Sequence, residues 1–244
     1  KRKRRMIKTL FFKDINLFFQ SPMGFLIISS YWLLAGFFFS FNTVFVSAVD
    51  MVSAFHNMCI LLLFFTPIIT MRCFSEEYRN GTLELFLAYG VNECDFVAAK
   101  FLFLTCILFI LIAGSLPAVG ILIIFSEPDL GPIIGGYLGL ILLGLTFFSI
   151  GLLSSVLSAF QIVSAVIAWF ILLFLWFVDY FSVFVKGASK EFLMSISFSN
   201  NYIDLIRGVF DLSSSFYFLS VCIFCLFLTS KFLMHRKYFG RVSV

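Results

Sequence analysis

The stretch RCFSEEYRNGTLELFLAYGVNECDFVAAK, residues 72–100, places charged residues between two long apolar segments. Roughly 20 apolar residues precede it and end near Met71, and another apolar run begins at Phe96. A helix rising 1.5 Å per residue needs about 20 residues to cross the hydrocarbon core of a bilayer. The stretch therefore predicts a polar connection between two membrane-spanning helices, where the chain can meet a soluble protein.

The composition places the whole chain in a membrane. Hydrophobic residues make up 61% of the 244 residues and charged residues 12%, and the mean hydropathy is +1.08. Globular proteins carry about 25% charged residues. The apolar runs are continuous rather than alternating, which favours helices over a membrane β-barrel. We expect an all-α integral membrane protein that forms a single transmembrane domain over residues 1–244.

Six apolar runs are long enough to span a bilayer: residues 25–45, 51–71, 96–125, 133–157, 162–179 and 215–233. Pro117 lies inside the third run and predicts a break near Ser115. The connection between the last two runs, residues 181–213, is more polar, and its apolar spacing predicts a short extracytoplasmic helix within residues 200–210.

Residues 6–20 predict a short amphipathic helix ahead of the first span. Its apolar side consists of Ile7, Leu10, Phe11, Ile15, Leu17 and Phe18. About 15 residues are too few to cross the bilayer, so this helix is expected to lie in the membrane interface. The sequence Ser21-Pro22-Met23-Gly24 follows it and predicts a turn into the first span.

The distribution of basic residues predicts the orientation. Six spans bring both termini to one side, and on that side lie all but three of the 17 Lys and Arg residues. The exceptions are Lys186, Lys190 and Arg207. Because cytoplasmic segments are rich in Lys and Arg, both termini are expected to be cytoplasmic. The basic residues flank membrane spans, so they indicate the lipid bilayer as partner and not a nucleic acid.

Residues typical of catalysis are not arranged in any recognisable motif. The sequence contains no Gly-x-x-x-x-Gly-Lys-Ser/Thr phosphate-binding motif, and His56 and His235 lie near opposite ends of spans. We therefore expect no enzyme activity, cofactor or metal site in this chain. Asp179 is the best candidate for a functional intramembrane carboxylate, although its position at the outer end of the fifth span favours an interfacial cap.

The connection at residues 72–95 predicts two short helices. Ser75 is expected to cap the first, with Glu76 and Glu77 in its first turn, and Asn80-Gly81 to end it. Thr82 is expected to cap the second, residues 83–88, which is apolar apart from Glu84. Such an apolar helix either packs against the membrane bundle or inserts into a groove on a cytosolic protein. The spacing favours neither.

The segment FSEEYRNGTLELFL, residues 74–87, followed by Lys100, resembles the cytoplasmic loop of type-2 ABC transporter permeases. Ala99 stands where those proteins have glycine before the lysine, and residues 88–90 depart from their usual exit turn. FFQSPMGF, residues 18–25, resembles the entry of the gliding-motility-associated (GldF-like) permease subunits. Residues 196–198, 207–212 and 216–220 resemble their C-terminal part. The resemblance thus extends over essentially the whole chain.

The resemblance implies a half-transporter with an elbow helix (residues 6–20), six spans and a cytoplasmic coupling helix. A separate cytosolic ABC ATPase, which binds ATP and Mg²⁺, would dock beneath the coupling helix. Further implied partners are a second permease copy or paralogue and a membrane protein with a large extracytoplasmic domain. The implied location is the bacterial inner membrane. The residues implied are Glu76, Glu77, Arg79, Gly81, Thr82 and Glu84 for coupling, Ser21, Pro22 and Gly24 for the elbow, and Tyr202, Asp204, Arg207 and Asp211 for an extracytoplasmic gate.

Three functions remain open from the sequence. The first is an ATP-driven export permease. Its substrate is not identified, and the small number of charged residues in the spans is compatible with a hydrophobic molecule. The second is a force-transmitting membrane subunit that remodels an extracytoplasmic partner without moving a solute. The third is a channel, for which Ser154, Ser155, Ser158 and Ser164 offer only a thin polar stripe.

Overall fold

A computed structural model describes residues 2–45, 51–82, 92–125, 130–182, 188–206 and 212–239. Every regular element in these residues is a helix. Six segments of the described chain are long and apolar enough to span a membrane. The prediction of an all-α, multi-pass membrane protein is therefore confirmed.

The spans follow the apolar runs closely. The helices are α1 (Arg2–Gln20), α2 (Pro22–Phe45), α3 (Met51–Thr70), α4 (Ser75–Arg79), α6 (Glu93–Ala113), α7 (Leu116–Phe125), α8 (Leu130–Leu157), α9 (Gln161–Phe181), α10 (Ala188–Ile196), α11 (Phe198–Ile206) and α12 (Leu212–Phe239). The third span is broken between α6 and α7, where the sequence predicted a break. Pro117 explains it, because its ring excludes the carbonyl of Ala113, four residues earlier, from continuing the helix.

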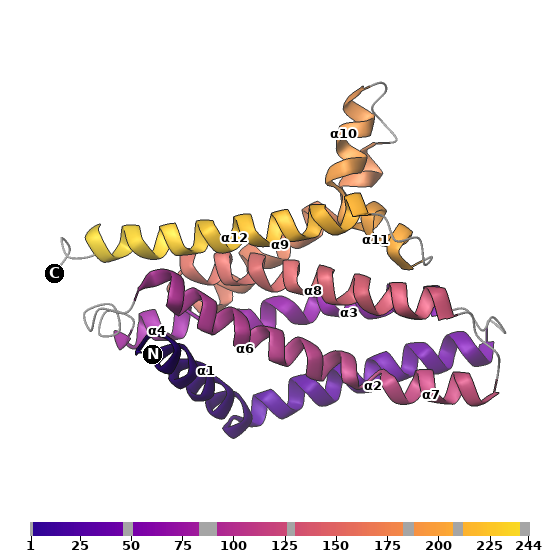
Figure 1. Cartoon of the computed structure of the whole chain (residues 1–244), viewed down its shortest axis with the longest axis horizontal. Coiled ribbons are helices and arrows are strands. Elements are labelled where there is room, and N and C mark those ends of the chain that lie inside the picture. Colours follow the sequence, from indigo (N-terminus) through magenta and orange to yellow (C-terminus); the bar gives the residue numbers. More distant parts are fainter. Residues whose placement is uncertain are drawn as a thin grey trace.

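Helix α8 lies at the centre of the bundle. It contacts α3, α6, α9, α11 and α12. Both ends of the described chain, together with α4, lie at one end of the bundle, while α7 and the C-terminal end of α2 lie at the other (Figure 1). We call the end that holds α4 the terminal end of the bundle.

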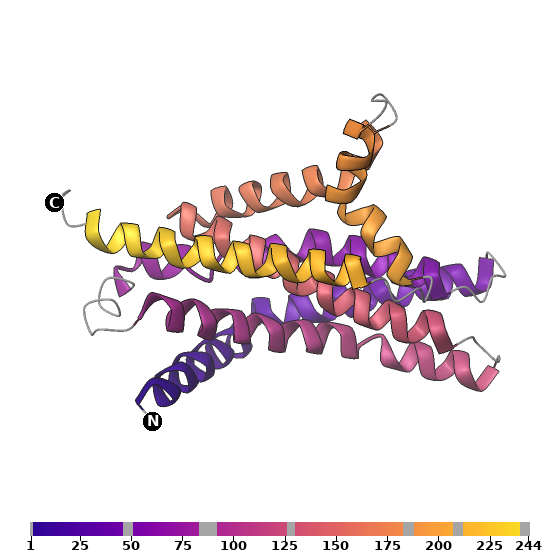
Figure 2. The same cartoon turned by 45° about the horizontal axis from the view of Figure 1, so that its top comes forward.

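Helix α1 does not continue the line of α2 but turns back at an angle and packs against α6 (Figure 2). Leu10 and Asp14, one helical turn apart, are buried on its packed side. Leu17, which the helical wheel placed on the apolar side with Leu10, is 55% exposed. The packed side also holds a carboxylate, Asp14, which finds partners there.

Helix α11 lies where a helix was predicted within residues 200–210, but its bounds differ. It begins earlier, at Phe198, and is described to Ile206. The Tyr202 hydroxyl donates a hydrogen bond of 3.1 Å to the Phe55 carbonyl of α3. This bond fixes α11 to the spans, whereas α10 contacts α9 and α11 and projects from the rest of the bundle (Figure 1).

Candidate functional site

Helix α4 forms the first part of the charged connection. Its N-cap is Phe74, and no side chain caps it. The prediction that Ser75 is the cap is wrong, since Ser75 is the first helical residue. Its hydroxyl donates instead to the carbonyls of Ser155, at 3.1 Å, and Ser158, at 2.8 Å. Carbonyls at the C-terminal end of a helix lack partners within it, so those at the end of α8 are available to Ser75.

The end of α8 also holds the start of α4 through a second set of bonds. The Ser155 hydroxyl oxygen accepts hydrogen bonds from the backbone N–H groups of Phe74, at 2.9 Å, and Ser75, at 3.3 Å. Both serines are buried. The first turn of α4 is thereby anchored to the central helix of the bundle.

Helix α4 ends as the sequence predicted, at Asn80-Gly81. Gly81 has a φ of 68°, a left-handed conformation that costs glycine little and that commonly ends helices. The Thr82 hydroxyl donates to the Glu77 carbonyl at 3.2 Å. The predicted second helix, residues 83–88, and Glu84 lie outside the described residues.

The predicted coupling residues divide into two groups on α4. Glu77 is only 7% exposed. Glu76 and Arg79 are exposed, and so is Tyr78 between them, at 43%. The helix thus presents charged groups outward and directs one carboxylate into the protein.

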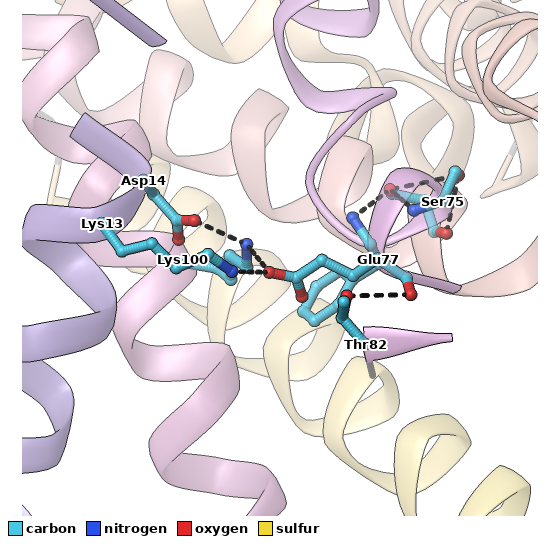
Figure 3. Close-up of polar contacts among 8 residues, drawn as sticks. Lys13, Asp14, Ser75, Glu77, Thr82 and Lys100 are labelled. Carbon is cyan, nitrogen blue, oxygen red and sulfur yellow. Dashed lines mark hydrogen bonds and ion pairs between the residues drawn. The ribbon is translucent and has the colours of Figure 1, made fainter. Parts of the chain in front are cut away.

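The buried Glu77 belongs to a cluster of four charged side chains (Figure 3). Lys100 Nζ of α6 lies 2.9 Å from Glu77 Oε1 and 3.0 Å from Asp14 Oδ1 of α1. Lys13 Nζ of α1 lies 2.8 Å from the same Glu77 oxygen. We refer to Lys13, Asp14, Glu77 and Lys100 as the charge cluster. It joins three helices that are far apart in the sequence.

Because the charge cluster is buried, each of its charges needs an oppositely charged partner. The side chains of Lys100, Asp14 and Glu77 are 4%, 9% and 9% exposed, while that of Lys13 is 34% exposed. Removing one member of a buried ion pair leaves an uncompensated charge and is strongly destabilising. Burial also raises the pKa of the Asp14 carboxyl, and the positive charge of Lys100 opposes that shift only in part.

The elbow residues sit at the junction of α1 and α2. Pro22 is the first residue of α2, where its missing N–H has no cost, and the Ser21 hydroxyl accepts a hydrogen bond from the Met23 N–H at 3.3 Å. A Cβ at Gly24 would lie 2.2 Å from the Phe18 carbonyl oxygen. Glycine is therefore required for the close approach of the two helices at this turn.

A cavity of about 420 Å³ connects the elbow with α4. Five of the residues singled out in the sequence line it, and these are Ser21, Gly24, Glu76, Glu77 and Thr82. Lys13, Asp14 and Lys100 of the charge cluster line it as well. Two groups of residues more than 50 positions apart in sequence thus form one site.

Sequence reasoning missed the charge cluster. Neither the apolar pattern of residues 6–20 nor the resemblance of residues 74–87 and Lys100 indicates that Lys13, Asp14 and Lys100 lie together. The available signal was that these charges fall within otherwise apolar helices, where a charge needs a partner. Their pairing could not be read from sequence, because Lys100 and Asp14 are 86 residues apart.

Two further candidate residues, Tyr202 and Asp179, do not line this cavity. Tyr202 is buried and bonded to Phe55, the side chain of Asp204 is not described, and Arg207 and Asp211 lie outside the described residues. Asp179 lies near the end of α9, and its Oδ1 is buried with no hydrogen-bond partner among the described residues.

Of the four serines considered for a channel, Ser154, Ser155 and Ser158 bond to backbone groups, whereas the buried Ser164 hydroxyl has no hydrogen-bond partner among the described residues. The Ser154 hydroxyl donates to the Gly151 carbonyl at 2.8 Å, and the Ser158 hydroxyl bonds to the backbone of Phe160. Ser155 anchors α4, as described above. These three hydroxyls are occupied by backbone groups, which weakens the channel interpretation.

No protein-family model matches the sequence, and a search of curated proteins finds no match.

Proposed function

We propose that this chain is the membrane subunit of an ATP-driven ABC exporter of the type-2 class, similar to the gliding-motility-associated permeases. A separate cytosolic ATPase docks on residues 72–90 and supplies the energy. Both termini are cytoplasmic in a bacterial inner membrane, and a second permease copy or paralogue completes the transporter. The substrate class that best suits the apolar spans is hydrophobic.

One observation carries this proposal: α4 is exposed on one side and bonded to three helices on the other. Glu76 and Arg79 are available to a partner. Glu77 joins α4 to α1 and α6 through the charge cluster, and Ser75 joins it to α8. A force applied to the exposed side would reach an interfacial helix and two spans without crossing a flexible linker. An energy-coupling element requires this combination.

Purification of the full chain from its native membrane in mild detergent tests the proposal. The expected result is a stoichiometric partner that carries a phosphate-binding Gly-x-x-x-x-Gly-Lys-Ser/Thr motif and hydrolyses ATP. Recovery of the chain without an ATPase, under conditions that keep other membrane complexes of the same cell together, would contradict it.

A force-transmitting role without solute transport is the second candidate. The observation that favours it is α10, which contacts α9 and α11, projects from the rest of the bundle and exposes Lys190 and Glu191 (Figure 1). In that case the partner complex would hydrolyse ATP, and crosslinks from α10 would identify a membrane protein with an extracytoplasmic domain. Absence of such crosslinks in the assembled complex would leave export as the function.

A further inference from the structure

The cavity between the elbow and α4 has a size and a lining that the proposed coupling role does not require. Its volume of about 420 Å³ falls within the range of about 300–1,000 Å³ typical of small-molecule sites. Its lining combines charged side chains with apolar ones, among them Leu17, Phe18, Met23, Ile27 and Ile68. A lining of both kinds suits an amphiphile.

Two carboxylate oxygens beside the cavity lack hydrogen bonds. Asp14 Oδ2 and Glu77 Oε2 are buried and have no partner among the described residues, while their other oxygens accept from the lysines. Burying an acceptor without a hydrogen bond is costly. The terminal torsion of a carboxylate is broad, so a small rotation presents these oxygens to a donor in the cavity. The donor they suit best is a primary ammonium group.

A positive side chain completes the set. Arg72 lines the same cavity, is exposed, and makes no ion pair with any residue that the structure describes. A guanidinium binds phosphate oxygens in a bidentate manner. The cavity therefore offers acceptors for an ammonium and a donor for a phosphate.

The position of the cavity identifies the source of such a ligand. The first span begins with α2 at Pro22, and Ser21, Met23 and Gly24 line the cavity, so it lies at the end of the spans. Lipid headgroups occupy this level of a bilayer. Leu17, which lines the cavity, is 55% exposed, and Phe25, 59% exposed, follows in α2. Acyl chains can leave the cavity along these apolar side chains.

We propose that the cavity binds the headgroup of a phospholipid with a primary ammonium, of the phosphatidylethanolamine kind. The ammonium donates to Asp14 and Glu77, and the phosphate pairs with Arg72. The lipid fills the space between α1 and α4 and satisfies the two carboxylate oxygens. The inference needs no ATPase, so it stands or falls separately from the proposed function.

Native mass spectrometry of the full chain tests the site after reconstitution with equal amounts of phosphatidylethanolamine, phosphatidylcholine and phosphatidylglycerol. Phosphatidylethanolamine is expected to be retained about tenfold more than phosphatidylcholine, because a trimethylammonium group cannot donate the charge-assisted hydrogen bonds. Equal retention of these two lipids would overturn the proposal. Retention of phosphatidylglycerol at the level of phosphatidylethanolamine would also overturn it. Attraction between the lipid phosphate and the positive side chains of the cavity would then explain binding without an ammonium group.

Matched variants locate the site. Arg72→Gln is expected to lower phosphatidylethanolamine retention about tenfold. The control is Arg79→Gln, which is expected to leave retention unchanged. Arg79 is also exposed and lies seven residues away, but it does not line the cavity. Met23→Trp, which fills the cavity, is expected to lower retention as well. Equal effects of the two arginine variants, or full retention in Met23→Trp with a folded protein, would contradict the assignment.

Discussion

Lys100 occupies the centre of the charge cluster because its ammonium group contacts both buried carboxylates. Its Nζ lies 3.0 Å from Asp14 and 2.9 Å from Glu77. In the low-polarity interior these contacts offset the cost of burying three charges only while all of them are present. The contribution of each of these residues to stability therefore depends on the presence of its partners.

Replacing Lys100 by Met is expected to destabilise the protein by about 3–5 kcal/mol, since two buried carboxylates would lose their common partner. Thermal unfolding of the purified chain in detergent measures the effect. The triple variant Asp14→Leu/Glu77→Leu/Lys100→Met removes the charges together and is expected to recover most of the loss. A Lys100→Met protein as stable as the wild type would show that the cluster does not hold these helices.

Asp14 predicts a pH dependence of stability. Burial raises its pKa in the folded protein above the usual value of 3.8, so the folded state holds the Asp14 proton more tightly than the unfolded state does. The contribution of this proton to the stability of the folded protein is fully present below the usual pKa of 3.8 and is lost as pH rises through the raised pKa. Asp14→Asn is expected to remove this dependence. Unfolding temperatures of both proteins between pH 4 and 8 test it, and parallel curves would contradict it.

At the scale of elements, α4 is short but firmly placed. Five residues do not form a stable helix alone, and its position depends on bonds to α1, α6 and α8. The buried and exposed residues alternate along it, so that Ser75 and Glu77 hold it and Glu76 and Arg79 remain available. Charge reversal at Glu77 would therefore disturb the fold, and a test of docking must use the exposed residues.

Ser155→Ala is expected to loosen the start of α4. Two buried N–H groups would lose their acceptor, at about 1–3 kcal/mol for an unsatisfied group, and amide exchange at Phe74 and Ser75 should accelerate about tenfold or more. Ser154→Ala is the matched control, because the Ser154 hydroxyl bonds only to its own helix. Equal exchange in the two variants would show that Ser155 does not anchor α4.

The elements were more predictable from the sequence than their contacts. Spans follow from apolar length, and the break near Ser115 follows from Pro117, because both depend on local chemistry. The role of Ser75 could not be predicted, because carbonyls of α8 some 80 residues away compete with the local capping bond. The elbow and α4 were recognised separately, and only the fold shows that they share one cavity.

At the scale of the whole molecule, the anchoring contacts gather at one end. The charge cluster, the Ser75–Ser155 contact and both described ends of the chain lie at the terminal end of the bundle (Figures 1 and 3). Helix α8 runs from this end through the centre and contacts five other helices. A displacement of α4 would therefore act on a central helix with five neighbours, which suits transmission across the membrane.

The most direct test of this account is the binding of the ATPase partner to a chain with a reversed docking face. Glu76→Lys/Arg79→Glu changes only exposed charges of α4, and Lys190→Glu/Glu191→Lys makes an equivalent exchange on α10, away from α4 (Figure 1). Co-purified ATPase and its ATP hydrolysis are measured for both variants and the wild type. The account predicts that the α4 variant folds, remains in the membrane and loses the ATPase, with about tenfold less bound, while the α10 variant keeps it. Full ATPase binding and hydrolysis in the α4 variant would contradict docking at this helix.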